Sequence, residues 1–138
     1  MQQQEQFMSA GWQLETRNGT LPDFGPIWWK TEEDGARRFA FRVENSHTDA
    51  QNTLSNSALL AFADHYVGSA ATTDETISLV TIQLETSFIT PAFVGEIVEG
   101  QAKISGKDGK LVYLAGSACV GDRVVSRSAG IWKILSPR

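Results

Sequence analysis

One acidic residue, Asp64, lies in the middle of a strongly apolar part of the sequence. The stretch from Ala58 to Ala71 is apolar almost all round, which is typical of a helix that is buried on most sides. Burying an ionised carboxylate without partners is very costly, so a buried Asp64 must be hydrogen-bonded, protonated or facing a cavity. A carboxylate in such a place is a candidate for function. Alternatively, Asp64 lies on a narrow exposed stripe of the helix, and periodicity leaves both interpretations open.

The start of the same helix offers a second chemical possibility. Ser55, Asn56 and Ser57 are all good N-cap residue types, and free backbone N–H groups at a helix N-terminus stabilise a developing oxyanion. On one helix, Asn56 and Asp64 are separated by about 12 Å, at 1.5 Å per residue. They cannot both contact one carbonyl carbon from the same chain. A shared substrate would therefore require a dimer with the active site at its interface.

Before the helix, the sequence predicts two strands and a loop. FGPIWWK and RRFAFRVE predict strands that are joined by a turn at Asp34-Gly35. The polar, turn-forming residues 45–54 predict a loop that leads into the helix.

After the helix, the sequence predicts four more strands. From Ile77 the apolar period changes to two, which places Val80, Ile82, Leu84, Thr86 and Phe88 on one face of a strand and Thr81 on the other. Further strands are predicted near residues 96–105, 111–120 and 123–135, with all four forming an antiparallel meander. The order β-β-α-β-β-β-β is that of an α+β domain in which one sheet curls around one helix.

The composition indicates one globular domain. The chain has 138 residues, of which 41% are apolar and 20% charged. We expect an N-terminal segment over residues 1–20, partly disordered or forming a short helix, and a single domain over residues 21–138. No apolar stretch reaches the roughly 18 residues of a membrane span and no signal peptide is evident, so we expect a cytoplasmic protein without membrane partners. A single cysteine, Cys119, and two histidines supply neither a disulfide nor a metal-ligand cluster.

Charge is unevenly distributed along the chain. Residues 1–100 carry a net charge of −9 and residues 101–138 a net charge of +5, within a total of −4. The net acidity disfavours nucleic-acid binding. The basic C-terminal third leaves room for a local anion site, such as one for a small ligand that carries phosphates.

Several stretches together resemble a known family. HTDAQNTLSNSALLAFAD is followed by TIQLETSFITPAFVGE, which contains F-x-x-P-A-x-x-G-E from Phe88 to Glu96, and by GKLVYLAGSACVGDRVVSRSAGIWKIL. This layout, over about residues 36–135, resembles the hotdog-fold acyl-CoA thioesterases of the phenylacetate-pathway and 4-hydroxybenzoyl-CoA type. The resemblance implies a hotdog fold, in which an antiparallel sheet wraps around one long central helix.

The family pattern can be carried over position by position. The family's loop and helix start reads H-T-N-x-x-G-x-x-H-G-G, with an Asp seven residues after the last Gly. Here Asp49 stands at the Asn position, Ser55 at the second His, and Asn56-Ser57 at the Gly-Gly pair, while the helix Asp is Asp64. Thr81 corresponds to a Ser or Thr of the next strand.

The resemblance implies a role for each of these positions. Asp64 is the general base or the nucleophile toward the thioester, and the backbone N–H of Asn56 from the other subunit polarises the carbonyl. Asp49 orients the substrate or water, and Thr81 supports the water.

The resemblance also implies where the substrate binds. Ser55 and Ser57 fall at substrate-binding positions, and Lys107 and Lys110 are candidates to contact the phosphates of coenzyme A. We therefore expect a homodimer, pairing further into a dimer of dimers, that binds a small acyl-CoA molecule. No metal or separate cofactor is implied, since coenzyme A is part of the substrate.

The leading hypothesis is an acyl- or aryl-CoA thioesterase, and two alternatives remain. The replaced His-Gly-Gly motif suggests a non-catalytic acyl-CoA-binding hotdog domain. A hotdog enoyl-CoA hydratase, with His47 and Asp49 as its His/Asp pair, is the third hypothesis.

Overall fold

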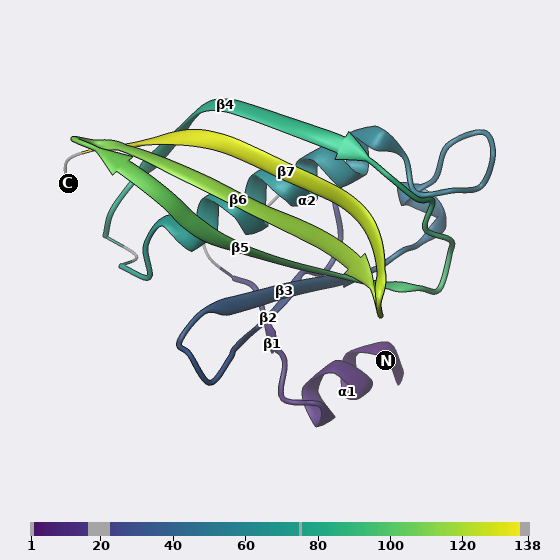
Figure 1. Ribbon diagram of the computed structural model, residues 1–138. Coiled ribbons are helices and arrows are strands. Elements are labelled where there is room, and N and C mark those ends of the chain that lie inside the picture. Colours follow the sequence, from purple (N-terminus) through teal and green to yellow (C-terminus); the bar gives the residue numbers. More distant parts are fainter. Residues whose placement is uncertain (1, 17–22, 75, 136–138) are drawn as a thin grey trace.

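The computed structural model describes residues 2–16, 23–74 and 76–135. The expected antiparallel sheet around one central helix is confirmed: seven strands in the order β1-β2-β3-β5-β6-β7-β4 curve around helix α2 (Figure 1). The strands are β1 (Gln13–Leu14), β2 (Trp28–Thr31), β3 (Arg37–Arg42), β4 (Leu79–Phe88), β5 (Ile97–Asp108), β6 (Leu111–Val120) and β7 (Arg123–Ile134). The helices are α1 (Gln2–Ser9) and α2 (Asn56–Gly68), and the short 3-10 turns are η1 (Asn45–His47) and η2 (Ser69–Ala71).

Helix α2 forms where the apolar stretch predicted it. Its N-cap is Ser55, whose side chain accepts a hydrogen bond from the Ala58 N–H at 3.1 Å. The buried face consists of Leu59, Phe62, Ala63, Tyr66 and Val67. Gly100 of β5 lets Tyr66 approach closely, because a Cβ at that glycine would lie 2.7 Å from the tyrosine ring. Apolar burial on this face holds the helix against the sheet.

The predicted four-stranded meander is wrong in its first strand. Strands β5, β6 and β7 form a meander, but β4 pairs with β7 and leaves residues 89–96 to carry the chain across to β5. Consecutive strands pair most often, which is why the sequence favoured the simpler order. The observed order makes β4 an edge strand, at the opposite edge of the sheet from β1, and β4 contacts α2.

A β-bulge in β4 overturns the predicted division of its faces. Thr81 pairs with Trp132 of β7, whereas Gln83 pairs with the adjacent Ile131, so Ile82 is an extra residue. The bulge shifts the alternation by one position. Thr81 consequently shares the helix-facing side with the C-terminal half of the strand, and Val80 points to the other side.

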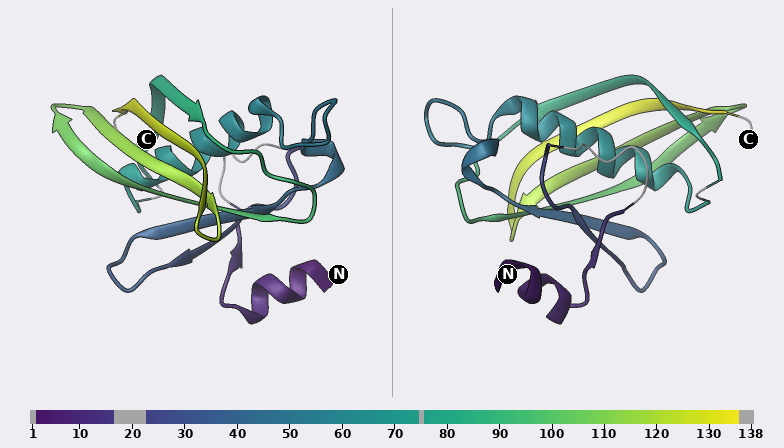
Figure 2. Two further views of the ribbon diagram at one scale, coloured as in Figure 1. Left: turned by 45° about the vertical axis from the view of Figure 1, so that its right-hand side comes forward. Right: turned by 180° about the vertical axis from the view of Figure 1, so that it is seen from behind.

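The N-terminal segment contributes a second small core on the outer face of the sheet. The ring of Phe7 from α1 stacks on Trp28 of β2, with ring centroids 4.9 Å apart, and Trp12 and Ala40 complete the cluster. Figure 2 shows α1 on the side of β2 and β3 that faces away from α2. The expected boundary after residue 20 lies in the range 17–22, outside the described residues.

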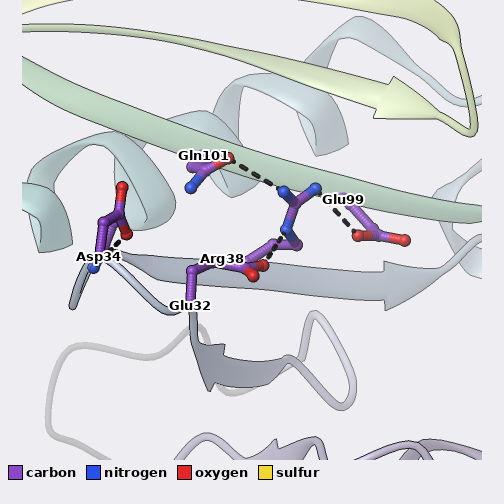
Figure 3. Close-up of polar contacts among 6 residues, drawn as sticks. Glu32, Asp34, Arg38, Glu99 and Gln101 are labelled. Atoms are coloured by element: carbon purple, nitrogen blue, oxygen red, sulfur yellow. Dashed lines mark hydrogen bonds and ion pairs between the residues drawn. The ribbon is translucent and has the colours of Figure 1, made fainter.

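Polar contacts on the same outer face connect the β2–β3 hairpin to β5. The Arg38 guanidinium bonds Glu32 beside the turn and Glu99 and Gln101 on β5 (Figure 3). The turn itself is the predicted Asp34-Gly35, where the Asp34 side chain accepts from the Ala36 N–H. These contacts lie on the opposite side of the sheet from α2. Among the described residues, no helix is long and apolar enough to cross a membrane.

Candidate active site along the central helix

Asp64 lies on the exposed stripe of α2, which decides between the two interpretations of its position. In the single chain its side chain is exposed, and its Oδ1 accepts a hydrogen bond from the Thr81 hydroxyl at 2.7 Å. Its Oδ2 makes no hydrogen bond with any residue that the structure describes. One carboxylate oxygen is thus held by β4, and the other is free to take a proton or to attack an electrophile.

The β4 bulge explains why Thr81 reaches Asp64. Uninterrupted alternation would place Thr81 on the opposite face of β4 from Thr86 and Phe88, as the sequence predicted. Because Ile82 is an extra residue, Thr81 lies opposite the buried Trp132 and on the helix side. Bulges commonly re-aim one side chain in this way. A bulge has no reliable sequence signal here, so only the family resemblance connected the two residues.

A small pocket lies at the start of α2, one and a half turns or more from Asp64. Its volume is about 200 Å³. It is lined by polar and apolar residues: Asp49, Thr53, Leu54, Asn56, Leu59, Phe88, Ile89, Thr90, Pro91, Ala92 and Val125. The sequence singled out Asp49 and Asn56, which the structure brings together here. It missed most apolar lining residues, although the Phe88–Pro91–Ala92 passage marked their location.

Free backbone donors border this pocket. The N–H groups of Asn56 and Ser57, in the first turn of α2, have no acceptor among the described residues. Ser55, by contrast, uses its hydroxyl as the helix cap, and Ser57 is exposed beside it. The expected helix-start donors are therefore present, whereas the Ser55 side chain already has a structural partner.

Asp49 holds the loop that precedes α2. Its carboxylate accepts hydrogen bonds from the Gln51 and Thr53 N–H groups at 2.9 and 3.2 Å and from the Thr53 hydroxyl. Desolvation, the largest single cause, opposes ionisation, but these donors together outweigh it and lower the pKa of Asp49. Asn52, in the same loop, has a positive φ of 62°. A role of Asp49 in orienting substrate or water stays a prediction.

The His47/Asp49 pair that a hydratase would use is not assembled. His47 is only 5% exposed. Its Nε2 lies 2.6 Å from the Phe24 carbonyl oxygen, and its Nδ1 accepts from the Glu44 N–H. Asp49 instead bonds within its own loop. The arrangement gives His47 no free nitrogen with which to exchange a substrate proton.

The two candidate phosphate contacts lie at the far end of the sheet from the pocket. Lys107 and Lys110 are exposed at the β5–β6 hairpin, and Figure 1 shows that hairpin opposite the loop that leads into α2. Lys107 pairs with Val112, which pairs with Trp132, which pairs with Thr81. The lysine is thus on the same row of the sheet as Thr81, about 14 Å away across three strands. Both lysines are nearer the Asp64 end of the helix.

The site therefore consists of two halves, which lie at two different places along α2. The acid half contains Asp64 and Thr81, and the pocket half contains Asn56 and Asp49. Eight residues of helix separate the halves, so a single chain cannot apply both to one carbonyl group. The described residues include no group of three or more His, Cys, Asp or Glu that could hold a metal ion.

Comparisons with known proteins agree with this architecture. A family model described as "Thioesterase superfamily" matches residues 51–126, which is more than half of the chain. No curated protein matches significantly in sequence.

Solved structures of thioesterase-type proteins share the fold. A hypothetical thioesterase from Streptococcus pneumoniae TIGR4, solved with coenzyme A, superposes with a TM-score of 0.72 at 12% identity, covering 81% of this chain and 88% of that one. The PaaI protein of the E. coli phenylacetic acid degradation operon has a TM-score of 0.70 at 13% identity, covering 80% of each chain. The BH2602 protein of Bacillus halodurans, solved with CoA, has a TM-score of 0.71 at 16% identity, covering 80% and 74%. These similarities confirm the hotdog fold.

Proposed function

The chain belongs to the thioesterase superfamily, and from this premise we propose that it hydrolyses acyl- or aryl-CoA thioesters as a homodimer. The observation that carries the proposal is the hydrogen bond from Thr81 to Asp64, which presents a carboxylate on the exposed stripe of α2. An aspartate and a threonine are also the residues replaced by alanine in two further structures of the Streptococcus protein.

In the proposed reaction, Asp64 acts as a general base. Thr81 occupies Oδ1, so Oδ2 takes a proton from a water molecule as the water oxygen adds to the thioester carbon. Collapse of the tetrahedral intermediate breaks the C–S bond, and the CoA thiolate takes up the proton. In the nucleophile alternative, Oδ2 attacks the thioester carbon, the C–S bond breaks and CoA leaves as the thiolate, and water then hydrolyses the mixed anhydride to the acid and free Asp64. After a single turnover in H₂¹⁸O, label in the Asp64 carboxylate would identify the anhydride route, because the general-base route puts the label in the released acid alone.

The oxyanion in this proposal is stabilised by the partner subunit's helix start. The N–H of Asn56 is free among the described residues and borders the pocket. Backbone donors at a helix N-terminus are suited to developing negative charge. Because the donor belongs to the backbone, an Asn side chain at this position does not remove it. The apolar residues that line the pocket would contact the acyl or aryl group.

The exposed apolar edge of the sheet supports dimerisation. Val80 and Ile82 on the β4 edge are 43% and 54% exposed, and Leu60, between the two halves of the site on α2, is 38% exposed. An uncovered apolar edge strand promotes association, and proteins normally cover it. A second copy placed along β4 would cover these side chains and bring its own α2 close to Asp64. Further pairing into a dimer of dimers stays a prediction.

The proposed ligand is coenzyme A in thioester linkage. Two structural relatives were solved with coenzyme A. Lys107 and Lys110 lie at the end of the sheet that is nearer Asp64, where they could bind the phosphates. Water is the only other reactant, so the proposal needs no separate cofactor. The cytoplasmic location also stays a prediction.

A CoA-release assay tests the proposal directly. Short-chain, medium-chain and aryl-CoA thioesters are offered to the wild type, to Asp64→Asn and to Asp122→Asn, a matched control in the exposed β6–β7 turn. We expect release from at least one class, a loss of about 10²–10⁴-fold in Asp64→Asn, and no change in the control. Full activity of Asp64→Asn would remove this residue from the mechanism. Thermal stabilisation by acyl-CoA without release would favour the binding domain instead, and loss of an alkene without free thiol would favour the hydratase.

A further inference from the structure

His47 is a buried residue at the base of the loop that leads into α2. We propose that neutral His47 is a positioning residue for the pocket half of the site, and that protonation of its ring displaces the start of α2. This inference rests on the proposed function and adds a pH dependence to it. His47 itself contacts neither water nor substrate in the proposal.

The hydrogen bonds of the ring determine its tautomer. The Glu44 N–H donates to Nδ1 at 3.0 Å, so Nδ1 must carry a lone pair and no hydrogen. Nε2 therefore carries the hydrogen and donates it to the Phe24 carbonyl oxygen at 2.6 Å. A second proton, on Nδ1, would point at the Glu44 N–H and replace a hydrogen bond by a clash of two donors. This geometry accepts only the neutral ring.

The surroundings of the ring give little compensation for a positive charge. The rings of Phe24 and Phe41 pack against it with centroids 4.6 and 5.1 Å away. Within the same turn, the Glu44 carboxylate accepts from the His47 backbone N–H rather than from the ring. Neither ring nitrogen bonds a carboxylate, so protonation costs a hydrogen bond and gains no ion pair.

The other charged groups on the elements around the His47 ring are exposed or bond other residues. On the segment before β2, Asp23 is exposed beside Phe24 in the sequence. At the end of β3, the Arg42 guanidinium bonds the Gly95 carbonyl oxygen and Gln6. On the loop, Asp49 bonds Gln51 and Thr53, as described above.

The backbone of His47 connects the ring to the start of α2. Its carbonyl oxygen accepts from the N–H of Ser55, the helix N-cap, at 2.8 Å. The next residue, Thr48, forms a bridge with Leu54, whose N–H bonds the Ala92 carbonyl oxygen in the pocket. A shift of the ring would thus move the residue that caps the helix and, with it, the Asn56 N–H.

The pH dependence of kcat/KM tests this role, because the chain has only two histidines. The wild type is compared with His47→Gln and with the matched control His65→Gln, whose ring nitrogen bonds Glu15 instead. We expect wild-type activity to fall on acidification once the His47 ring takes up a second proton, because the hydrogen bond from the Glu44 N–H is then lost. His65→Gln should keep that fall, and His47→Gln should be several-fold less active at neutral pH and lack it. An unchanged profile in His47→Gln, or loss of the fall in His65→Gln, would overturn the proposal.

A second measurement does not depend on thioester hydrolysis or on a folded variant. Nitrogen-15 NMR of the wild-type protein at pH 7.5 should show His47 with a protonated Nε2 and an unprotonated Nδ1. On acidification, the backbone amide signals of Ser55 and Asn56 should shift together with the His47 ring signals. An Nδ1-protonated ring, or amide signals that do not follow His47, contradicts the inference. If the wild type hydrolyses none of the tested thioesters, the proposed function fails. This measurement still decides the role of His47 in that case.

Discussion

At the scale of single residues, the hydrogen bond between Thr81 and Asp64 is the contact that most directly shapes the proposed chemistry. It fixes the rotamer of an otherwise exposed carboxylate and leaves one oxygen available. An unrestrained side chain on a helix surface samples several rotamers, and most of them would point Oδ2 away from a bound thioester. The Thr81 hydroxyl therefore orients the Asp64 carboxylate and does not act as an acid in the proposed reaction.

Replacing Thr81 by Val removes the donor while keeping the shape of the side chain. We expect kcat/KM for CoA thioesters to fall about tenfold, since a hydrogen bond to a charged group is worth about 1.5 kcal/mol. Thr81→Ser should retain most activity because it keeps the hydroxyl. Thr86→Val is the matched control: Thr86 lies on the same face of β4 but bonds Ser128. Equal losses in the two Val variants would show that the effect comes from strand packing.

The sequence identifies a site residue only where the neighbouring residues in the sequence mark it. Asp64 stands out because a charge interrupts an apolar helix, and Asn56 because cap-forming residues precede that helix. The side of β4 on which Thr81 lies could not be deduced, since a single extra residue reverses the alternation without changing the apolar pattern. The enclosure of the His47 ring depends on Phe24 and Glu44, whose contacts with it arise only from the folded chain.

At the scale of elements, the N-terminus of α2 links stability to the site. The Ser55 cap satisfies one of the first-turn N–H groups and leaves those of Asn56 and Ser57 free. A helix end that is fixed in this way presents its remaining donors in a constant direction. The cap that stabilises the helix and the proposed oxyanion donor thus lie in the same turn of α2.

Ser55→Ala should lower the free energy of unfolding by about 1 kcal/mol, because the cap hydrogen bond is lost. Ser57→Ala, two residues further on, should change it little, since its exposed side chain makes no cap bond. Urea denaturation followed by circular dichroism measures both. A Ser57 effect as large as that of Ser55 would mean that the cap has been assigned to the wrong serine.

The order of the elements was predictable, but their pairing was only partly so. Helix and strand periods indicate the sequence of elements from β2 to β7, and the Asp34-Gly35 turn lies where expected. Pairing of β4 with β7 is a long-range choice that no local signal determines. The packing of Phe7 on Trp28 is likewise a long-range contact that no local signal determines.

At the scale of the whole molecule, the proposed function requires an interface along β4. Lysine at Ile82 would put a charge at the centre of that edge, so Ile82→Lys should give a folded monomer with strongly reduced hydrolysis. Ile104→Lys, on β5, replaces another exposed isoleucine and should leave both properties unchanged. Analytical ultracentrifugation and the CoA-release assay measure the two outcomes. A monomeric variant with full activity would refute the shared site.

Mixing two inactive variants gives the sharpest test of a site that is shared between subunits. Asp64→Asn removes the base, and Asn56→Pro removes the backbone N–H together with the Asn side chain. Proline is favoured at this first helical position, and Ser55 already has the extended backbone, with φ of −69° and ψ of 151°, that a following proline requires. Each variant alone should therefore fold and be nearly inactive.

Subunit exchange should restore activity if the two halves come from different chains. In a mixed dimer, one of the two sites combines an intact Asp64 from one chain with an intact Asn56 from the other, and the second site lacks both. With equal amounts and random pairing, about half of the dimers are mixed, so the mixture should recover about a quarter of wild-type activity. If both groups acted from the same chain, every site would contain one defect and mixing would restore nothing. Native mass spectrometry of the mixture confirms that exchange has occurred, so that a null result counts against the interface.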